Sequence, residues 1–338
     1  MPQITSIAFL SPGNYPDDAP LEGLEETLDL FAFGERLGFD GAWVRQRHLE
    51  HGVSSAAVFL AAATQRTHRI ELGTAVIPLG YESPFRLAED LATVDVLSGG
   101  RVQIGVSAGT PPHRELLGDL VFEHGLGDQD VSFGRVDRLV QHLRSEFLGD
   151  EETRIVSPGN VQRPRLQPHS AGLAERVWYG GVSLDSVRSA GERGLHLLTG
   201  NIVSVPGERD FAAAQRTLID VYRGSGGAGR IALGRVIVPT DSADAATRER
   251  YRAYGAARLE RTTSEHGPKG TRFARDLIGT SEQILEALAA DPILDEVTEL
   301  RLELPYELTG ADYRQILTDF AAGVAPHLGW RRSLAAVS

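Results

Sequence analysis

Short apolar runs alternate with longer amphipathic runs along almost the whole chain, and this alternation limits the folds available to it. The longer amphipathic runs, such as Leu21–Leu37 and Ser55–Arg66, carry apolar residues at helical spacing. Strands joined by helical crossovers are parallel. We expect eight strands, at Ile4–Leu10, Phe39–Val44, Ile70–Ile77, Val102–Val106, Arg176–Gly181, Leu195–Thr199, Ile231–Val238 and Thr298–Leu304.

Eight such units close naturally into a barrel, although a doubly wound sheet can also hold eight strands. The first strand is followed by Ser11-Pro12-Gly13 rather than the G-x-G-x-x-G of nucleotide-binding sheets. We therefore predict an α/β fold, a (β/α)8 TIM barrel, as a single domain over 1–338 with insertions after strands four and seven. Residues 149–175 read as an irregular excursion, and 241–276 as a partly helical insertion that covers the site as a lid.

Composition excludes several classes of function. The net charge of −12, from 34 basic and 46 acidic residues, disfavours binding to nucleic acid or to anionic membranes. The absence of cysteine excludes disulfides, thiolate catalysis and cysteine-based metal sites. No apolar run approaches the length of about 18 residues that a membrane helix needs, and the N-terminus does not resemble a signal peptide. We expect a cytoplasmic protein that binds neither nucleic acid nor membrane.

Small residues stand where three successive expected strands end, for example at Thr74-Ala75 and Ser107-Ala108-Gly109. In a βα barrel these ends form the active-site face. Small side chains there leave room for a large flat ligand.

Residues 180–186, GGVSLDS, join the fifth strand to a helix. Backbone N–H groups at a helix start, together with the hydroxyls of Ser183 and Ser186, can bind an anion such as phosphate. A tight turn with a serine N-cap explains the same residues without any ligand, and the sequence leaves both readings open.

Polar residues follow the second strand at Arg47, His48 and His51. An i, i+3 histidine pair without a third ligand is a weak metal signal, and we expect no metal. Histidine titrates near neutral pH, so His48 suits acid–base or hydrogen-bonding work. The alternative is that His48 or Arg47 pairs with Glu50 at the barrel rim.

Several segments together resemble the bacterial luciferase-like flavin monooxygenase family. They are GFDGAWVRQRH from 38, RIELGTAVIPL from 69, SPFRLAEDLATVDVLSGGRVQIGVSAGTP from 83, VWYGGVSLDSVRSAGERGL from 177, LIGTSEQI from 277 and ELRLELPYE from 299. The resemblance covers most of the chain and is weakest at 112–170 and 240–275. It implies a (β/α)8 barrel that binds reduced flavin mononucleotide (FMN) at the C-terminal strand ends.

The resemblance also assigns cofactor residues. The flavin ring would lie near Ala75, Val76 and Ser107, with a cis peptide bond between Ala75 and Val76. The phosphate would bind in the loop already noted, at Gly181, Val182, Ser183 and Ser186.

Two departures from the family pattern affect the expected chemistry. Gln46-Arg47-His48 replaces the Glu-His-His that often follows strand two, so only His48 matches. Ser107-Ala108 replaces the Cys-Arg of luciferase, whose arginine binds the phosphate. The luminescent reaction on a long aldehyde is therefore not expected.

The resemblance implies a two-component flavin-dependent monooxygenase. It would use reduced FMN and O₂ on a small organic substrate, with a separate flavin reductase and with His48 and Arg47 as catalytic residues. One alternative is hydride transfer with the deazaflavin F420, whose acidic tail could bind Arg114 and Arg188. Another is a non-catalytic flavin-binding accessory protein. Members of the family form homodimers through helices two and three, and we expect the same here.

Overall fold

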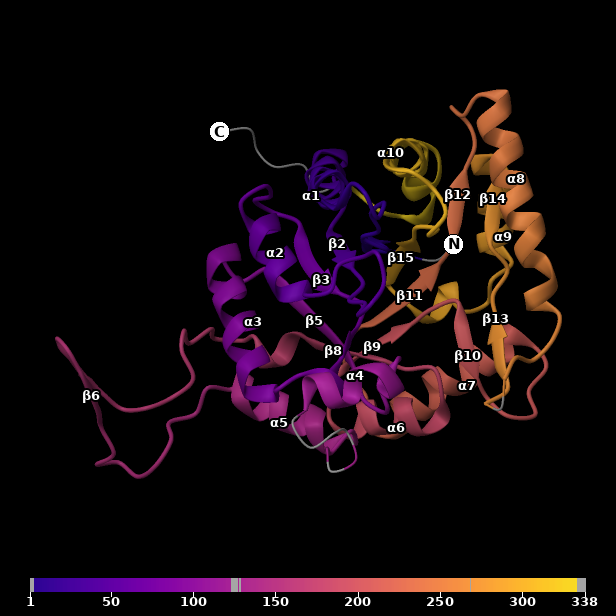
Figure 1. Cartoon of the computed structure of the whole chain (residues 1–338). Helices are drawn as coiled ribbons and strands as arrows, with labels where there is room; N and C mark the ends of the chain where they lie inside the picture. Colours follow the sequence, from indigo (N-terminus) through magenta and orange to yellow (C-terminus); the bar gives the residue numbers. More distant parts are fainter. Residues whose placement is uncertain (1–2, 123–126, 128, 268, 333–338) are drawn as a thin grey trace.

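The computed structural model describes residues 3–122, 127, 129–267 and 269–332. Eight parallel strands form a closed ring in which β1 pairs with β2 and β15, and β3 pairs with β5 to complete the circle (Figure 1). The prediction of a (β/α)8 TIM barrel is confirmed. The barrel strands are β1 Ser6–Ser11, β2 Gly41–Val44, β3 Glu71–Thr74, β5 Val102–Ser107, β8 Val177–Gly180, β9 His196–Thr199, β11 Ile231–Arg235 and β15 Glu299–Glu303.

Helices surround the ring and return the chain from one strand to the next. α3 begins after Ser83 with proline at its first position and ends at Gly99, whose φ of 74° is left-handed. The barrel helices are α1 Pro20–Leu37, α2 Ala56–Thr64, α3 Pro84–Ser98, α5 Gly134–Leu143, α6 Leu184–Glu192, α7 Phe211–Gly224, α9 Ser281–Ala289 and α10 Gly310–Asp319.

Two expected strands are each divided into two in the structure. The third ends at Thr74 and resumes as β4 Ile77–Pro78, and the peptide bond between Ala75 and Val76 is cis, as the resemblance implied. The seventh is divided into β11 and β12 Ile237–Pro239. α5 ends at Leu143, and Ser145 shortly after it adopts a positive φ of 53°, which an α-helix does not allow.

The excursion at 149–175 is not wholly irregular. It contains an antiparallel hairpin of β6 Ile155–Ser157 and β7 Asn160–Gln162, which projects from the body beyond α3 (Figure 1). Because it follows α5, which runs antiparallel to the strands, it leaves the barrel at the end opposite to the active-site face. After β5 itself the chain forms α4 Arg114–Val121.

The second insertion lies between β12 and α9. It consists mainly of α8 Ala245–Leu259, β13 Thr271–Phe273 and β14 Leu277–Gly279. β13 pairs with β10 Ile202–Ser204, which follows β9, and β14 pairs with β12. The insertion is therefore attached to segments that follow two barrel strands, on the side of their C-terminal ends.

The molecule has two apolar cores. The larger lies between the strands and the helices. The smaller fills the barrel and includes Trp43 and Trp178, whose rings meet edge to face at 5.7 Å. Trp43 fits because Gly73 has no side chain: a Cβ there would lie 2.0 Å from the indole Cδ2.

The barrel interior is also charged, whereas bulky branched apolar residues usually fill it. At the N-terminal end, Arg230 lies 3.5 Å from Glu71 and forms an ion pair with Glu299. Arg301 lies two residues after Glu299 on β15, and Glu303 follows after two more residues, at the C-terminal end of the strand. These three alternate residues of β15 place a column of charge along the barrel.

Candidate functional site

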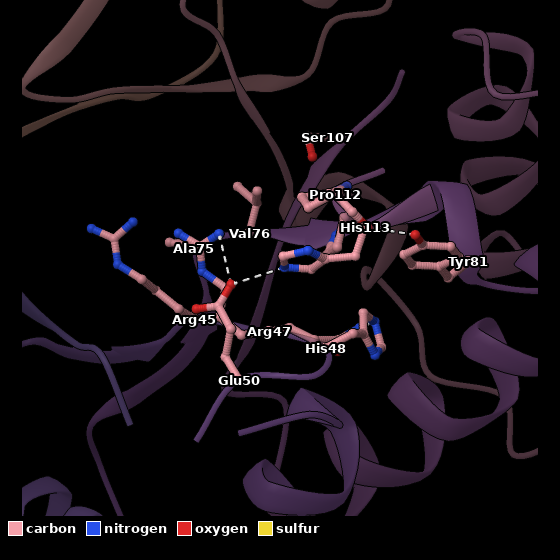
Figure 2. Close-up of a pocket in the computed structure, with 12 residues that line it drawn as sticks. Arg45, Arg47, His48, Glu50, Ala75, Val76, Tyr81, Ser107, Pro112 and His113 are labelled. Atoms are coloured by element: carbon pink, nitrogen blue, oxygen red, sulfur yellow. Dashed lines mark hydrogen bonds and ion pairs between the residues drawn. The ribbon is translucent and has the colours of Figure 1, made fainter. Parts of the chain in front are cut away.

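A cavity of about 860 Å³ opens at the C-terminal ends of the barrel strands. An adjoining pocket of about 590 Å³ is more polar and lies over the segment after β2 (Figure 2). The two share Arg45, Ala75, Val76 and Ser107 in their walls. They therefore form one continuous site, with a large region over the barrel and a polar side region.

Strands β3 and β5 separate at this end, which exposes Ala75 and Val76 to the site. The Thr74 hydroxyl inserts between the strands, where it donates to the Gly105 carbonyl and accepts from the Gly105 amide, both at 2.9 Å. A Cβ at Gly105 would lie 2.0 Å from the Thr74 carbonyl oxygen, so only glycine allows this contact. Ser107, predicted beside Ala75 and Val76, lies in the same walls.

The loop predicted to bind phosphate is a capping box at the start of α6. The Val182 and Ser183 amides both donate to the Ser186 hydroxyl, at 3.1 and 2.9 Å. The Gly181 amide donates to the Leu198 carbonyl at 3.0 Å. Of these four predicted residues Val182 lines the cavity. Because those amides are already used, an anion here would bind the next amides of the helix or displace the Ser186 hydroxyl.

His48 is held in one tautomer by its neighbour Gln46. The side-chain oxygen of Gln46 accepts a hydrogen bond from the Ala56 amide at 3.0 Å. This turns the side-chain nitrogen of Gln46 toward Glu82, at 2.7 Å, and toward His48 Nε2, at 3.3 Å. An amide nitrogen only donates. His48 Nε2 must therefore accept, and its Nδ1 carries the proton.

The same surroundings keep His48 neutral. Burial lowers the pKa of His48 below its ordinary value of 6.5, His113 lowers it further, and Glu82 partly opposes them. The ring also packs edge to face against Tyr81 at 5.3 Å. At neutral pH His48 therefore presents an N–H donor rather than a positive charge.

The fixed charges of the side region come from Arg47, Arg45 and Glu50. Glu50 lies between Arg47, at 3.9 Å, and the His113 ring, at 3.5 Å (Figure 2). Arg47 also donates to the Tyr306 hydroxyl at 3.2 Å. Burial lowers the pKa of Arg47, but Tyr306 and Glu50 raise it by more, so Arg47 stays charged.

Sequence reasoning missed the ion pair of Arg45 and Glu303 at the centre of the site, with 3.0 Å between its atoms. Glu303 fits against the end of β9 and against β11 because glycine stands at both places. A Cβ at Gly200, directly after β9, would lie 2.7 Å from Glu303 Oε1, and one at Gly234 in β11 would lie 2.2 Å from it. The sequence of β15 could have indicated this pair, because Glu299, Arg301 and Glu303 alternate with leucine and so place charged side chains on one face of the strand.

His51, considered as a metal ligand, lies 3.3 Å from Asp17 and stacks against Tyr15. Within the part of the chain that the structure describes, there is no group of three or more acidic, histidine or cysteine side chains that could hold a metal. No helix among the described residues is both long and apolar enough to cross a bilayer.

The family of this chain follows from a comparison with family models. Residues 5–298 match the family described as luciferase-like monooxygenase. The 4-hydroxyprotoasukamycin monooxygenase of Streptomyces nodosus subsp. asukaensis is 32% identical over 228 residues, which are 65% of this chain and 59% of that protein. The chain thus spans less than two thirds of this relative.

Two further known proteins align over nearly the whole chain. The F420-dependent glucose-6-phosphate dehydrogenase of Rhodococcus erythropolis is 23% identical, with 93% of this chain and 96% of that protein aligned. The oxygenating constituent of 3,6-diketocamphane monooxygenase from Pseudomonas putida, solved with FMN, superposes with a TM-score of 0.65 at 14% identity, covering 96% and 99% of the two chains. The second likeness shows a common fold.

Proposed function

The chain belongs to the luciferase-like monooxygenase family, and from that premise we propose that it is an oxidoreductase, namely a flavin-dependent monooxygenase. It would use reduced FMN and O₂ to oxygenate a small organic molecule. The observation that carries the proposal is the open cavity over the barrel, which joins a polar region containing the neutral His48 together with Arg45 and Arg47.

The walls of the cavity suit a flat tricyclic group. They are lined by residues with little or no side chain, including Ala75, Ser107, Gly180 and Gly200. A Cβ at Gly180 would lie 3.0 Å from Val76 Cγ1 and would narrow the space between β8 and the end of β3. Val182, at the start of α6, would be nearest the phosphate, with Gly181, Ser183 and Ser186 forming the turn behind it.

When bound, reduced flavin would supply the electrons that activate O₂. His48 would donate its Nδ1–H to an oxygen atom of the substrate or of the activated dioxygen. Arg47 would hold negative charge in the same region, with Glu50 keeping its guanidinium in place. The insertion at 241–276 would close over the site and exclude water.

To test this proposal, the protein is given reduced FMN and isotope-labelled O₂ with a panel of small aromatic and terpenoid substrates. Incorporation of label into a product supports it. Absence of reduced-FMN binding in an anaerobic titration would refute it, and binding without any product would favour the accessory role.

Hydride transfer with F420 is the second candidate, because a relative aligned over nearly the whole chain depends on this cofactor. The arginines considered for its acidic tail do not form a ready site: Arg114 is exposed, and Arg188 pairs with Asp185 at 2.9 Å. Parallel titrations with FMN and F420 would separate the two functions, since the tighter ligand identifies the cofactor.

We also propose that reduced flavin comes from a separate flavin reductase, since the sequence contains no nicotinamide-binding fingerprint. The corresponding test is turnover. The protein with FMN and nicotinamide cofactor should be inactive until an unrelated flavin reductase is added, and activity without one would contradict the proposal.

A homodimer through α2 and α3 is a further part of the proposal. These neighbouring helices expose Val58, Val96 and Leu97 at 71%, 51% and 54%, and exposed apolar patches commonly mark interfaces. Replacing Val58 and Leu97 together by aspartate should give a monomer in light scattering. Leu21→Asp on α1, at a residue that is 72% exposed, is the control and should leave the mass unchanged. A double variant of unchanged mass would place the interface elsewhere.

A further inference from the structure

Arg301 lies inside the barrel, directly in the wall of the larger cavity. Its residue is 5% exposed, and its guanidinium lies 3.6 Å from the centre of the Trp43 ring and 5.7 Å from that of Trp178. The guanidinium thus packs against indole rings inside the barrel. The part of Arg301 that remains accessible therefore faces the cavity.

Among the described residues, the charge of Arg301 has no direct partner. Within residues 3–122, 127, 129–267 and 269–332, its side chain makes no hydrogen bond or ion pair, and its Nε is buried without an acceptor. Burying a guanidinium in this way is costly. Arg235, which is 4% exposed, shows the usual arrangement: it pairs with Asp291 at 2.8 Å and donates to Gln215 at 2.7 Å.

The carboxylates near Arg301 are occupied by other arginines. Glu71 and Glu299 pair with Arg230 at the N-terminal end of the barrel, and Glu303 pairs with Arg45 at the mouth. Burial lowers the pKa of Arg301 to about 10, with the three carboxylates opposing it, so it remains charged at neutral pH. The column thus offers one positive charge to whatever enters the cavity.

We propose that Arg301 is a cofactor-binding residue that recognises the anionic, electron-rich edge of a reduced tricyclic cofactor and makes the site select the reduced form. The inference rests on the proposed function. Reduced flavin is largely anionic at neutral pH, with its charge over the N1–C2 carbonyl edge, whereas the oxidised ring is neutral. A fixed charge that is itself almost fully buried distinguishes two such forms more strongly than a charge in water would.

The first test uses the unaltered protein, titrated anaerobically with oxidised and with reduced FMN. A hydrogen bond to a charged group is strong enough that reduced FMN should bind at least about tenfold more tightly. Equal affinity for the two forms would overturn the inference while leaving the proposed function intact. Failure of both forms to bind would overturn the proposed function and the inference with it.

The second test compares variants. Arg301→Gln should abolish the preference for reduced FMN, which lowers the potential of the bound flavin by about 30 mV for each tenfold loss in a two-electron couple. Arg301→Lys keeps the charge and should retain most of the preference. The assignment would be contradicted if Arg301→Gln kept the parent's ratio of affinities for reduced and oxidised FMN while its circular dichroism matched the parent.

The matched control is Arg230→Gln. Arg230 also faces the barrel interior and lies over the same Trp178 ring, at 4.9 Å, but it is at the end opposite to the cavity. Its loss should lower stability without changing the ratio of affinities. An equal change in both variants would assign the effect to the charge of the whole barrel rather than to Arg301, and would overturn the inference.

Discussion

His196, the first residue of β9, should make folding stability depend on pH. Its ring packs against Trp178 with 4.7 Å between centroids, and its Nδ1 accepts the Arg230 amide at 3.0 Å. Burial, followed by the Arg230 charge, lowers the pKa of His196 from 6.5 to about 4. The folded protein therefore keeps this histidine neutral over a pH range in which the unfolded chain would protonate it.

The sign and size of the effect follow from proton binding. Above pH 6.5 both states are neutral at His196 and the full stability is present. As the pH falls toward 4, the unfolded state gains a proton that the folded state lacks, so the free energy of unfolding drops by up to about 3 kcal/mol. Below that value both states are protonated and the difference stays constant.

The measurement is urea unfolding of the parent and of His196→Asn from about pH 8 to about pH 4. Asparagine places an acceptor near the position of Nδ1 but does not titrate, so the variant should lose less stability than the parent as the pH falls. The exposed His169→Asn provides the control and should follow the parent. Parallel profiles for the parent and His196→Asn would refute the reasoning.

Three further outcomes are expected. Asp95→Asn should lower the free energy of unfolding by about 3–5 kcal/mol, because it breaks the buried ion pair with Arg176. It should leave FMN affinity unchanged, because this pair lies far from the mouth of the barrel. Urea unfolding and flavin titration measure the two effects, and a loss of FMN affinity would contradict the prediction. Gly73→Ala should lower the free energy of unfolding by about 1–3 kcal/mol, since the added methyl group would overlap Trp43. A stability equal to that of the parent would show that the barrel core can adjust. His48→Ala should reduce kcat by at least about 100-fold with FMN affinity unchanged, and unaltered turnover would remove His48 from the mechanism.

Much of the fold could be predicted from local pattern. Strand periodicity and helical spacing depend on neighbouring residues, so the eight barrel strands occur in the predicted order. Strand ends were less certain, because the turn at Ala75–Val76 depends on contact between Thr74 and Gly105. Those residues belong to different strands.

The candidate site was predicted in part. Arg47, His48, Ala75, Val76 and Ser107 come together in the walls of one pocket, as expected for residues at C-terminal strand ends. Their binding and catalytic roles stay predictions. The turn at the start of α6 was recognised, but its use of the Ser186 hydroxyl to cap two amides could not be read from residue types.

The sequence by itself determined a parallel α/β barrel and small residues at its active-site end, because both follow from periodicity and from the direction of the chain. Only the tertiary structure decided which charges meet. Alternation along β15 marks one polar face, but closure of the ring turns that face inward and sets it against strands far away in the chain. Glu303 is matched by Arg45, and Arg301 is left facing the cavity. Ion pairs depend on distances across the barrel, and those distances are fixed by the register of all eight strands together.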